Sequence, residues 1–394
     1  MALKIVRQPG QIAVIGAPSS AGAHNAGMEK APAAFRSAGL VERLREAGFT
    51  VSDLGDIPTF TCQPDEESPR ARNLKNVVAA LNALNPQIEI AAKSGALILV
   101  LGGECTMALA TIAGLRRYYR NVSLWWLDSD ADLNVPATTP SGCVHGMALA
   151  HIIGRGAPEL VRFWGEPPLV REPDVILFGV DRLDAPEAAF LERSAMKRYA
   201  AADIVRRGVA AAAQEALARL HAEHRDFVLH LDLDFIAGED LPSVDFPGTG
   251  GIRLDAAREI VAMAASQQHL LAVDIASYNP DKDPSGTDAK KIVDFIVSAL
   301  SARLALPAPA AVPAASKKHA RGAAADAASV VPMPAPAPAG ATGAPAVEPE
   351  PESRSGDSLG APPDSADEPP AALGETLPES SSEPPADEKD ESSS

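Results

Sequence analysis

Short apolar runs alternate with longer stretches of helical periodicity along the first 306 residues, and this alternation constrains the fold more than any other feature. The apolar runs cover residues 12–15, 96–101, 122–127, 174–180, 227–233 and 270–275, with weaker candidates at 50–54 and 198–200. The helical stretches cover 32–47, 74–93, 106–119, 209–223, 254–265 and 288–304. Alternating strands and helices are typical of a parallel sheet covered on both faces. We therefore predict an α/β fold with three layers, α-β-α, around a mostly parallel sheet of about eight strands.

The composition changes abruptly near residue 306. The segment 307–394 has 15 Asp and Glu against 5 Lys and Arg, holds 17 of the chain's 35 prolines and contains no Phe, Tyr or Trp. Such a segment cannot bury enough apolar surface to fold. The sequence thus predicts one folded domain, residues 1–306, and a disordered acidic tail rich in Pro, Ala and Ser, residues 307–394, acting as a spacer rather than a docking segment.

Charge and cysteine content indicate the compartment and exclude some partners. The formal net charge of −17 argues against a nucleic-acid partner. The three cysteines, Cys62, Cys105 and Cys143, are odd in number and widely spaced, so we expect no disulfide framework and a reducing compartment. The start of the chain lacks the apolar core of a signal peptide, and no apolar run is long enough to cross a bilayer. We predict a cytoplasmic protein with no membrane role.

Five aspartates follow two of the predicted strands. Asp128, Asp130 and Asp132 come after the strand at 122–127, and Asp232 and Asp234 end the strand that begins at 227. Alternate residues of an extended segment share a face, and their repeat is about 6.6 to 6.8 Å. Ligands of open parallel sheets bind beyond the carboxyl ends of the strands, where these carboxylates would converge and repel one another without cations. The pattern predicts a divalent-metal centre.

Other interpretations of the Asp-x-Asp pattern are less favoured. A single Asp-x-Asp is more often a solvated loop or cap, but two clusters after apolar strands favour a metal site. An EF-hand loop is excluded because Leu133 and Thr139 stand where it needs Gly and Glu. A magnesium-dependent phosphatase with Asp232-Leu-Asp234 as its nucleophile motif remains a minor competitor.

Cys105 and His145 are the other candidates near this sheet edge. Paired glycines, Gly102 and Gly103, allow a tight turn and close backbone approach before Cys105, which alone would be a small buried hydrophobe but can also be a metal-bound thiolate. His145 follows a loop rich in hydrogen-bonding groups after the first Asp cluster. The other histidines lack such neighbours in the sequence and are interpreted as surface or satisfied core residues: His24, His151, His221, His224, His230, His269 and His319.

Four motifs occur in a characteristic order. They are Gly102-Gly103-Glu104-Cys105, Asp128-Ser-Asp130-Ala-Asp132, Ser141-Gly-Cys-Val-His145-Gly146 and Asp232-Leu-Asp234. With them the chain resembles the arginase (ureohydrolase) family, whose pattern is Gly-Gly-Asp-His, Asp-Ala-His-x-Asp, Ser-Gly-x-x-His-Gly and Asp-x-Asp. The resemblance extends from Ile15 to Pro280 and covers essentially all of the predicted domain.

The resemblance implies a binuclear centre of two Mn²⁺ ions. In it Asp128 and Asp232 bridge the ions, Cys105 and Asp132 complete one ion, and Asp130 and Asp234 complete the other. A metal-bridging hydroxide attacks the guanidinium or amidine carbon, and the histidine matching His145 shuttles protons.

The resemblance also implies an amino-acid end of the site and an assembly. Residues matching Asn134, Thr139 and Ser141 hold a substrate α-carboxylate, and those matching Asp184 and Glu187 surround its α-amino group. The expected partner is a small-molecule amidine or guanidine substrate such as arginine or N-hydroxyarginine, and relatives commonly form trimers or hexamers.

Three positions with an assigned metal or substrate role depart from the family pattern. Cys105 and Asp130 replace two metal-ligand histidines, and Ser277 stands where arginases carry a glutamate that pairs with the guanidinium. A more negative ligand set makes the bound water a weaker acid, so we expect lower activity or a shifted pH optimum. Loss of the glutamate weakens guanidinium binding or signals another substrate, such as N-hydroxyarginine or a formimino compound. The alternative is a catalytically impaired binding or regulatory protein.

Overall fold

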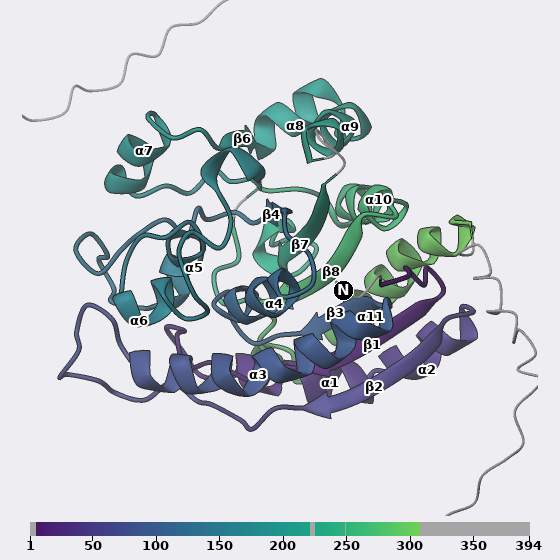
Figure 1. Cartoon of the computed structure of the whole chain (residues 1–394), viewed down its shortest axis with the longest axis horizontal. Coiled ribbons are helices and arrows are strands. Elements are labelled where there is room, and N and C mark those ends of the chain that lie inside the picture. Colours follow the sequence, from purple (N-terminus) through teal and green to yellow (C-terminus); the bar gives the residue numbers. More distant parts are fainter. Residues whose placement is uncertain (1–4, 221–224, 249, 308–394) are drawn as a thin grey trace, which may run out of the picture. The chain divides into compact units, whose positions relative to one another are not determined.

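The computed structural model describes residues 5–220, 225–248 and 250–307. An eight-stranded parallel sheet lies at its centre, with the strand order β2-β1-β3-β8-β7-β4-β5-β6 (Figure 1). The strands are β1 (Gln11–Gly16), β2 (Thr50–Asp56), β3 (Leu97–Leu101), β4 (Val122–Leu127), β5 (Val175–Gly179), β6 (Lys197–Ala200), β7 (Asp226–Asp232) and β8 (Leu270–Ala276). All the predicted strands are present and the predicted fold class is confirmed. Of the tail predicted to be disordered, all but Pro307 lies outside the described residues.

The position of a strand in the sheet explains the strength of its sequence signal. Strands β3, β4, β5 and β8 are buried along their whole length, so they are apolar except for Ser123 in β4 and Asp274 in β8. The edge strands β2 and β6 are largely exposed and carry charged residues such as Asp53 and Lys197. Exposure at the edges therefore accounts for the two weaker strand predictions.

Helices cover both faces of the sheet and form two separate cores. One core lies under α3 (Leu74–Ser94), α4 (Met107–Arg116), α5 (Ala148–Ile152) and α6 (Pro158–Val161). The other lies under α1 (Ala31–Ser37), α2 (Leu40–Glu46), α8 (Ala201–Arg207), α9 (Val209–Leu220), α10 (Leu254–Ala265) and α11 (Thr287–Leu300). Alternate residues of β1 divide between them, with Ala13 and Ile15 in the first core and Ile12 and Val14 in the second.

The remaining elements are short. Helix α7 (Ala185–Leu191) follows β5, and 3₁₀ turns occur at Met28–Lys30, His145–Met147, Glu172–Asp174, Leu233–Phe235, Pro280–Lys282 and Ser301–Ala305. The prediction of one helix over 32–47 is wrong, because Gly39 with φ of 85° separates α1 from α2. No helix among the described residues is both long enough and apolar enough to cross a membrane.

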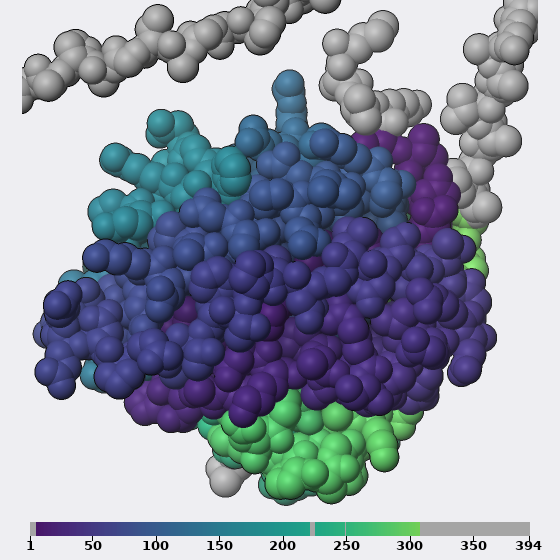
Figure 2. Space-filling view, turned by 90° about the horizontal axis from the view of Figure 1, so that it is seen from below, coloured from purple at the N-terminus to yellow at the C-terminus, as the bar shows by residue number. Residues whose placement is uncertain are grey.

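The N-terminal and C-terminal elements of the domain are neighbours. Helix α1 packs against α11, and in the space-filling view of Figure 2 the purple N-terminal surface borders the green surface of the C-terminal helical segment. Because every strand runs parallel, the carboxyl ends of β3, β4, β7 and β8 meet at one edge of the sheet. This edge is where the sequence predicts the metal centre.

A buried histidine in helix α5 allows a prediction about the stability of the domain. His151 is fully buried in α5, and its Nε2 accepts a hydrogen bond of 3.1 Å from the backbone N–H of Ala157. Burial disfavours the imidazolium and lowers the pKa of His151 from 6.5 to about 4. Below about pH 6.5 the histidine becomes protonated in the unfolded chain but stays neutral in the folded chain. The folded protein therefore loses stability as the pH falls toward 4.

The expected size of this loss can be measured with a neutral replacement. From about pH 7.5 to about pH 5, His151 should cost the folded protein about 2 kcal/mol of unfolding free energy. The His151→Gln variant should lose about that much less than the parent over the same range, as measured by urea unfolding at both pH values. Equal losses in the two proteins would refute the assignment.

Candidate metal centre and substrate cavity

The register of the central strands places two rows of side chains on one face of the sheet. Trp126, His230 and Asp274 are register partners on β4, β7 and β8, so they lie side by side. Two residues further along β4 and β7 come Asp128 and Asp232, on the same face because the strand repeat is two.

The glycine turn after β3 brings Cys105 to these residues. The N–H of Gly102 donates to Ile275 O at 2.8 Å, and the N–H of Ser277 donates to Gly103 O at 2.9 Å. A Cβ at position 102 would lie 2.4 Å from Ile275 O, and one at position 103 would lie 1.6 Å from Ser19 O. The close backbone approach predicted for these glycines is confirmed.

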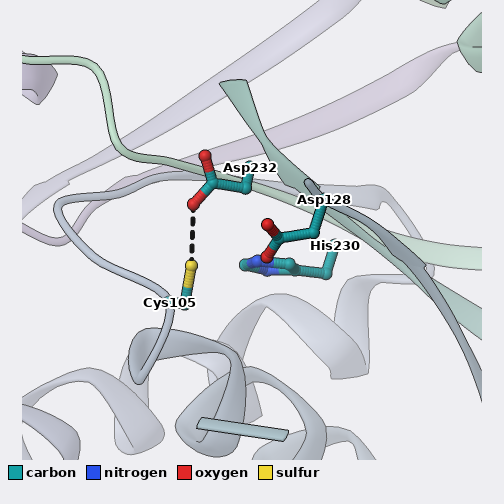
Figure 3. A group of neighbouring side chains, drawn as sticks. All are labelled: Cys105, Asp128, His230 and Asp232. Carbon is teal, nitrogen blue, oxygen red and sulfur yellow. Dashed lines mark hydrogen bonds between the residues drawn. The ribbon is translucent and has the colours of Figure 1, made fainter. Parts of the chain in front are cut away.

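Cys105, Asp128, His230 and Asp232 form the innermost group, and all four are buried. Each offers one ligand atom, and these atoms lie within 4.8 Å of one another. Figure 3 shows the four side chains pointing toward one another. The Sγ of Cys105 donates to Asp232 Oδ2 at 2.9 Å, and the Ser277 hydroxyl donates to the same oxygen.

A second group, Asp128, Asp130 and Asp234, surrounds the guanidinium of Arg182. Its Nε and Nη2 donate to the two oxygens of Asp130 at 3.0 and 2.7 Å, and Nη2 also donates to Asp234 Oδ2. Ligand atoms of the three aspartates again lie within 4.8 Å of one another. One protein cation thus already neutralises part of this acidic group.

The third group is Cys105, Asp132 and His145, with ligand atoms within the same distance. Asp132 has φ of 51°, a left-handed conformation that costs a residue with a side chain about 1 to 3 kcal/mol. Its buried Oδ2 has no hydrogen-bond partner among the described residues. The five aspartates and Cys105 predicted as ligands are therefore brought together.

Crowded buried carboxylates raise one another's pKa values. Burial, followed by neighbouring carboxylates, holds the pKa values of Asp128, Asp132 and Asp234 well above the usual range, and burial together with Asp232 does the same for the Cys105 thiol. Burial also acts on Asp232, but the charge of His145 and the hydrogen bonds from Cys105 and Ser277 outweigh it and leave its pKa lowered. A divalent cation would stabilise all the ionised forms, so the donor set fits such an ion.

His145 lies where the metal groups meet a cavity. Its Nδ1 accepts a 3.4 Å hydrogen bond from the N–H of Cys105 and lies 4.0 Å from the carboxylate of Glu104. With Nδ1 accepting, the other ring nitrogen, Nε2, carries a proton. His145 therefore has a defined orientation for proton exchange.

The cavity has a volume of about 990 Å³ and contains most of the residues assigned to substrate binding. Its lining includes Asp130, Asp132, Asn134, Thr139, Ser141, His145, Arg182, Asp184 and Glu187. The hydroxyl oxygens of Thr139 and Ser141 accept backbone N–H groups of Gly142 and Cys143 at 3.0 and 3.1 Å. Their hydroxyl hydrogens remain free to donate to an anionic group such as a carboxylate.

Four other residues assigned to substrate binding make hydrogen bonds within the protein. Glu187 is buried and accepts the N–H groups of Leu133, Asn134 and Asp184 at 2.8, 3.1 and 2.9 Å. Asn134 in turn donates to Asp184 at 2.7 Å. Ser277 does not line the cavity and contacts Asp232, so its substrate role remains a prediction.

Sequence reasoning missed two members of the site, His230 and Arg182. The interpretation of His230 as a histidine without functional neighbours is wrong, because its ring lies in the innermost group. The available signal was its position two residues before Asp232 in a strand, which puts both side chains on one face. Arg182 follows the end of β5 and had no comparable signal.

Comparisons with known proteins establish the family. The model of the Arginase family matches residues 10–301, and the chain belongs to this family. It is 34% identical to the arginase of Bacillus subtilis over 294 residues, covering 74% of this chain and 98% of the relative. It is 32% identical to the arginase of Bacillus caldovelox, covering 74% and 99%. The solved structure of Entamoeba histolytica arginase in complex with L-ornithine matches with a TM-score of 0.68 at 25% identity, covering 74% and 99%.

Membership of this family supports a hydrolase of the ureohydrolase type. The family is metal-dependent, in agreement with the buried acidic groups. The phosphatase interpretation of Asp232-Leu-Asp234 is set aside.

Proposed function

We propose that this protein is a metal-dependent hydrolase that cleaves a linear amidine or guanidine C–N bond of an arginine-like amino acid. The observation that carries the proposal is the single cavity in which His145 and Asp132 lie together with the hydroxyls and amide of Thr139, Ser141 and Asn134. The relative that was solved with L-ornithine binds an amino acid, which supports an amino-acid ligand here.

The roles of the residues follow from their positions. Bound metal would supply an activated water and polarise the carbon that is attacked. The family resemblance assigns the metal to the five aspartates and Cys105, with two Mn²⁺ ions among them, and His230 adds a further donor beside Cys105, Asp128 and Asp232. Thr139, Ser141 and Asn134 would orient the α-carboxylate, with Asp184 near the α-amino group. His145 would carry a proton between solvent and the departing nitrogen.

A substrate screen tests the proposal directly. The full chain, loaded with Mn²⁺ or Zn²⁺, is assayed with arginine, N-hydroxyarginine, formiminoglutamate, guanidinobutyrate and agmatine. We expect turnover of at least one of the three amino acids and none of agmatine, which lacks the α-carboxylate. Absence of turnover from a metal-loaded protein would refute hydrolysis of these substrates.

The proton-carrying role of His145 gives a separate prediction. The His145→Ala variant should lose about 100-fold or more in kcat, because general acid–base groups contribute about 10² to 10⁴. Its metal content, measured on the same sample, should stay that of the parent. Retained activity would show that another group moves the proton.

A second candidate function is a binding or regulatory protein without catalysis. The observation in its favour is Arg182, whose guanidinium engages two of the aspartates assigned to metal. Ligand binding detected by calorimetry with the same compounds, without turnover, would support it. The cytoplasmic location and the trimer or hexamer remain proposals, the second of which light scattering can test.

A further inference from the structure

We propose that the centre holds one ion, ligated by Cys105, Asp128, His230 and Asp232, that it prefers zinc-like cations to Mn²⁺, and that the guanidinium of Arg182 takes the place of a second ion. This inference deepens the proposed function and rests on it for the catalytic role of the ion. Its test reads bound metal rather than turnover, so either proposal can fail alone.

The side chain of His230 is held in one orientation. Its Nδ1 is hydrogen-bonded to Asp274 Oδ1, which lies opposite it on β8. The ring also stacks on Trp126 with 3.7 Å between centroids, and Trp126 Nε1 donates to Asp128 at 2.9 Å. A histidine held in this way has its proton on Nδ1 and its Nε2 lone pair directed away from Asp274.

The surroundings of His230 Nε2 favour a metal ion as its partner. His230 Nε2 is completely buried and has no hydrogen-bond partner among the described residues. Figure 3 shows the ring beside Asp128, with Cys105 and Asp232 completing the group. A metal-ligating histidine almost always donates its other ring N–H to a carboxylate or carbonyl, as His230 does to Asp274. The ring therefore has the orientation and the unpaired Nε2 of a metal ligand.

The four donor atoms of the innermost group favour zinc-like cations. One thiolate, one imidazole and two carboxylates give four donors of the types that Zn²⁺ binds in tetrahedral sites. Mn²⁺ prefers oxygen donors, whereas thiolate and imidazole ligands select zinc and related cations. Cys105, which replaces a family histidine, and His230 therefore both favour a zinc-like cation.

The guanidinium of Arg182 lies where a second ion would bind. Asp130 and Asp234 are the residues that the family resemblance assigns to it, and both contact the guanidinium of Arg182. Arg182 is further fixed by a 2.7 Å hydrogen bond from Nη1 to the carbonyl oxygen of Phe246. A second cation at Asp130 and Asp234 would have to displace this side chain and would meet its positive charge.

Metal stoichiometry and selectivity test the proposal on the full chain. Metal-free protein is equilibrated with equal concentrations of Zn²⁺ and Mn²⁺, separated from free ions and analysed for metal. Because most protein sites bind Zn²⁺ more tightly than Mn²⁺, the number of ions and the thiolate bond carry the test. We expect about one equivalent of zinc, and the Co²⁺ form should show the near-ultraviolet absorption of a cobalt–thiolate bond. Two equivalents of Mn²⁺ in the parent protein, or a Co²⁺ spectrum without that absorption, would overturn the proposal.

Variants separate the two halves of the inference. His230→Gln should weaken Zn²⁺ binding by at least about 10- to 100-fold, and Asp274→Asn by up to about 10-fold or more through the loss of the supporting carboxylate. His269→Gln, a change outside the cluster just before β8, should leave the affinity unchanged. Unchanged affinity in a folded His230→Gln variant, with circular dichroism as the check on folding, would exclude His230 as a ligand.

The Arg182→Met variant tests whether the guanidinium takes the place of a second ion. Removing the guanidinium should raise the stoichiometry from about one to about two equivalents, because Asp130 and Asp234 are then left with no cation. Arg198→Met is the matched control, since Arg198 donates to the carbonyl of Val180 instead, and it should stay at one equivalent. A folded Arg182→Met variant that still binds one equivalent would show that Arg182 does not replace an ion.

Discussion

The Asp232→Asn variant is expected to lose its bound metal and at least about three orders of magnitude in kcat/KM, because a metal ion supplies several kcal/mol of transition-state stabilisation. Asp232 contributes to the innermost group and receives hydrogen bonds from Cys105, Ser277 and the backbone of Asp234. Its pKa lies below the usual value while those of its neighbours are raised. The hydrogen bonds from Cys105 and Ser277 thus favour the carboxylate form of Asp232, which is the form that a cation binds.

This prediction is checked by metal analysis after desalting and by rates with the best substrate of the screen. The isosteric amide preserves the packing, so the variant should fold, and its unfolding midpoint verifies this. Asp226→Asn is the control at the opposite end of the same strand, where Asp226 pairs with Arg7. A variant at Asp232 that retains metal and activity would show that the ion lies elsewhere.

The Gly103→Ala variant should lose about 3 kcal/mol or more of unfolding free energy, beyond the usual cost of an added methyl group. The new Cβ would lie 1.6 Å from a backbone oxygen, Ser19 O, which cannot swing away as a side chain can. Relief requires the turn to move, and Cys105 follows two residues later. We therefore expect reduced metal affinity together with the lower stability.

Urea unfolding with and without added metal measures both effects. Gly10→Ala is the matched control, since nothing lies within 4 Å of its added Cβ and the residue immediately precedes β1. If Gly103→Ala stays within about 1 kcal/mol of the parent, the close approach of the two backbone segments is not a constraint on this turn.

The sheet could be predicted from sequence because its strands are buried on both faces. The run Leu97–Leu101 has no polar residue and is bounded by glycines and helical stretches, a pattern typical of a buried strand. Short helices such as α5 (Ala148–Ile152) and α6 (Pro158–Val161) escaped because one turn of helix has no measurable periodicity. The break at Gly39 escaped because apolar residues continue on both sides of it.

The candidate site divides in the same way. The aspartates could be predicted because they end strands whose carboxyl ends must meet. Arg182 could not, because its role depends on Asp130 and Asp234, which lie far from it along the chain. The strand repeat puts His230 on the face of Asp232, but Asp274, the partner that orients its ring, becomes a neighbour only through the strand order.

That strand order has a consequence for how the protein is made. Strand β8 is the last strand of the sheet to be synthesised, yet it lies between β3 and β7, in the middle of the sheet. Until it emerges, the newly made chain can only form two half-sheets, each with an open apolar edge that can pair with another chain. Cys105 belongs to one half, whereas Asp128, His230 and Asp232 belong to the other. The ligands can therefore meet only when β8 joins the two half-sheets. An ion bound at the cluster would then stabilise the completed sheet, after the open edges that favour aggregation have been paired.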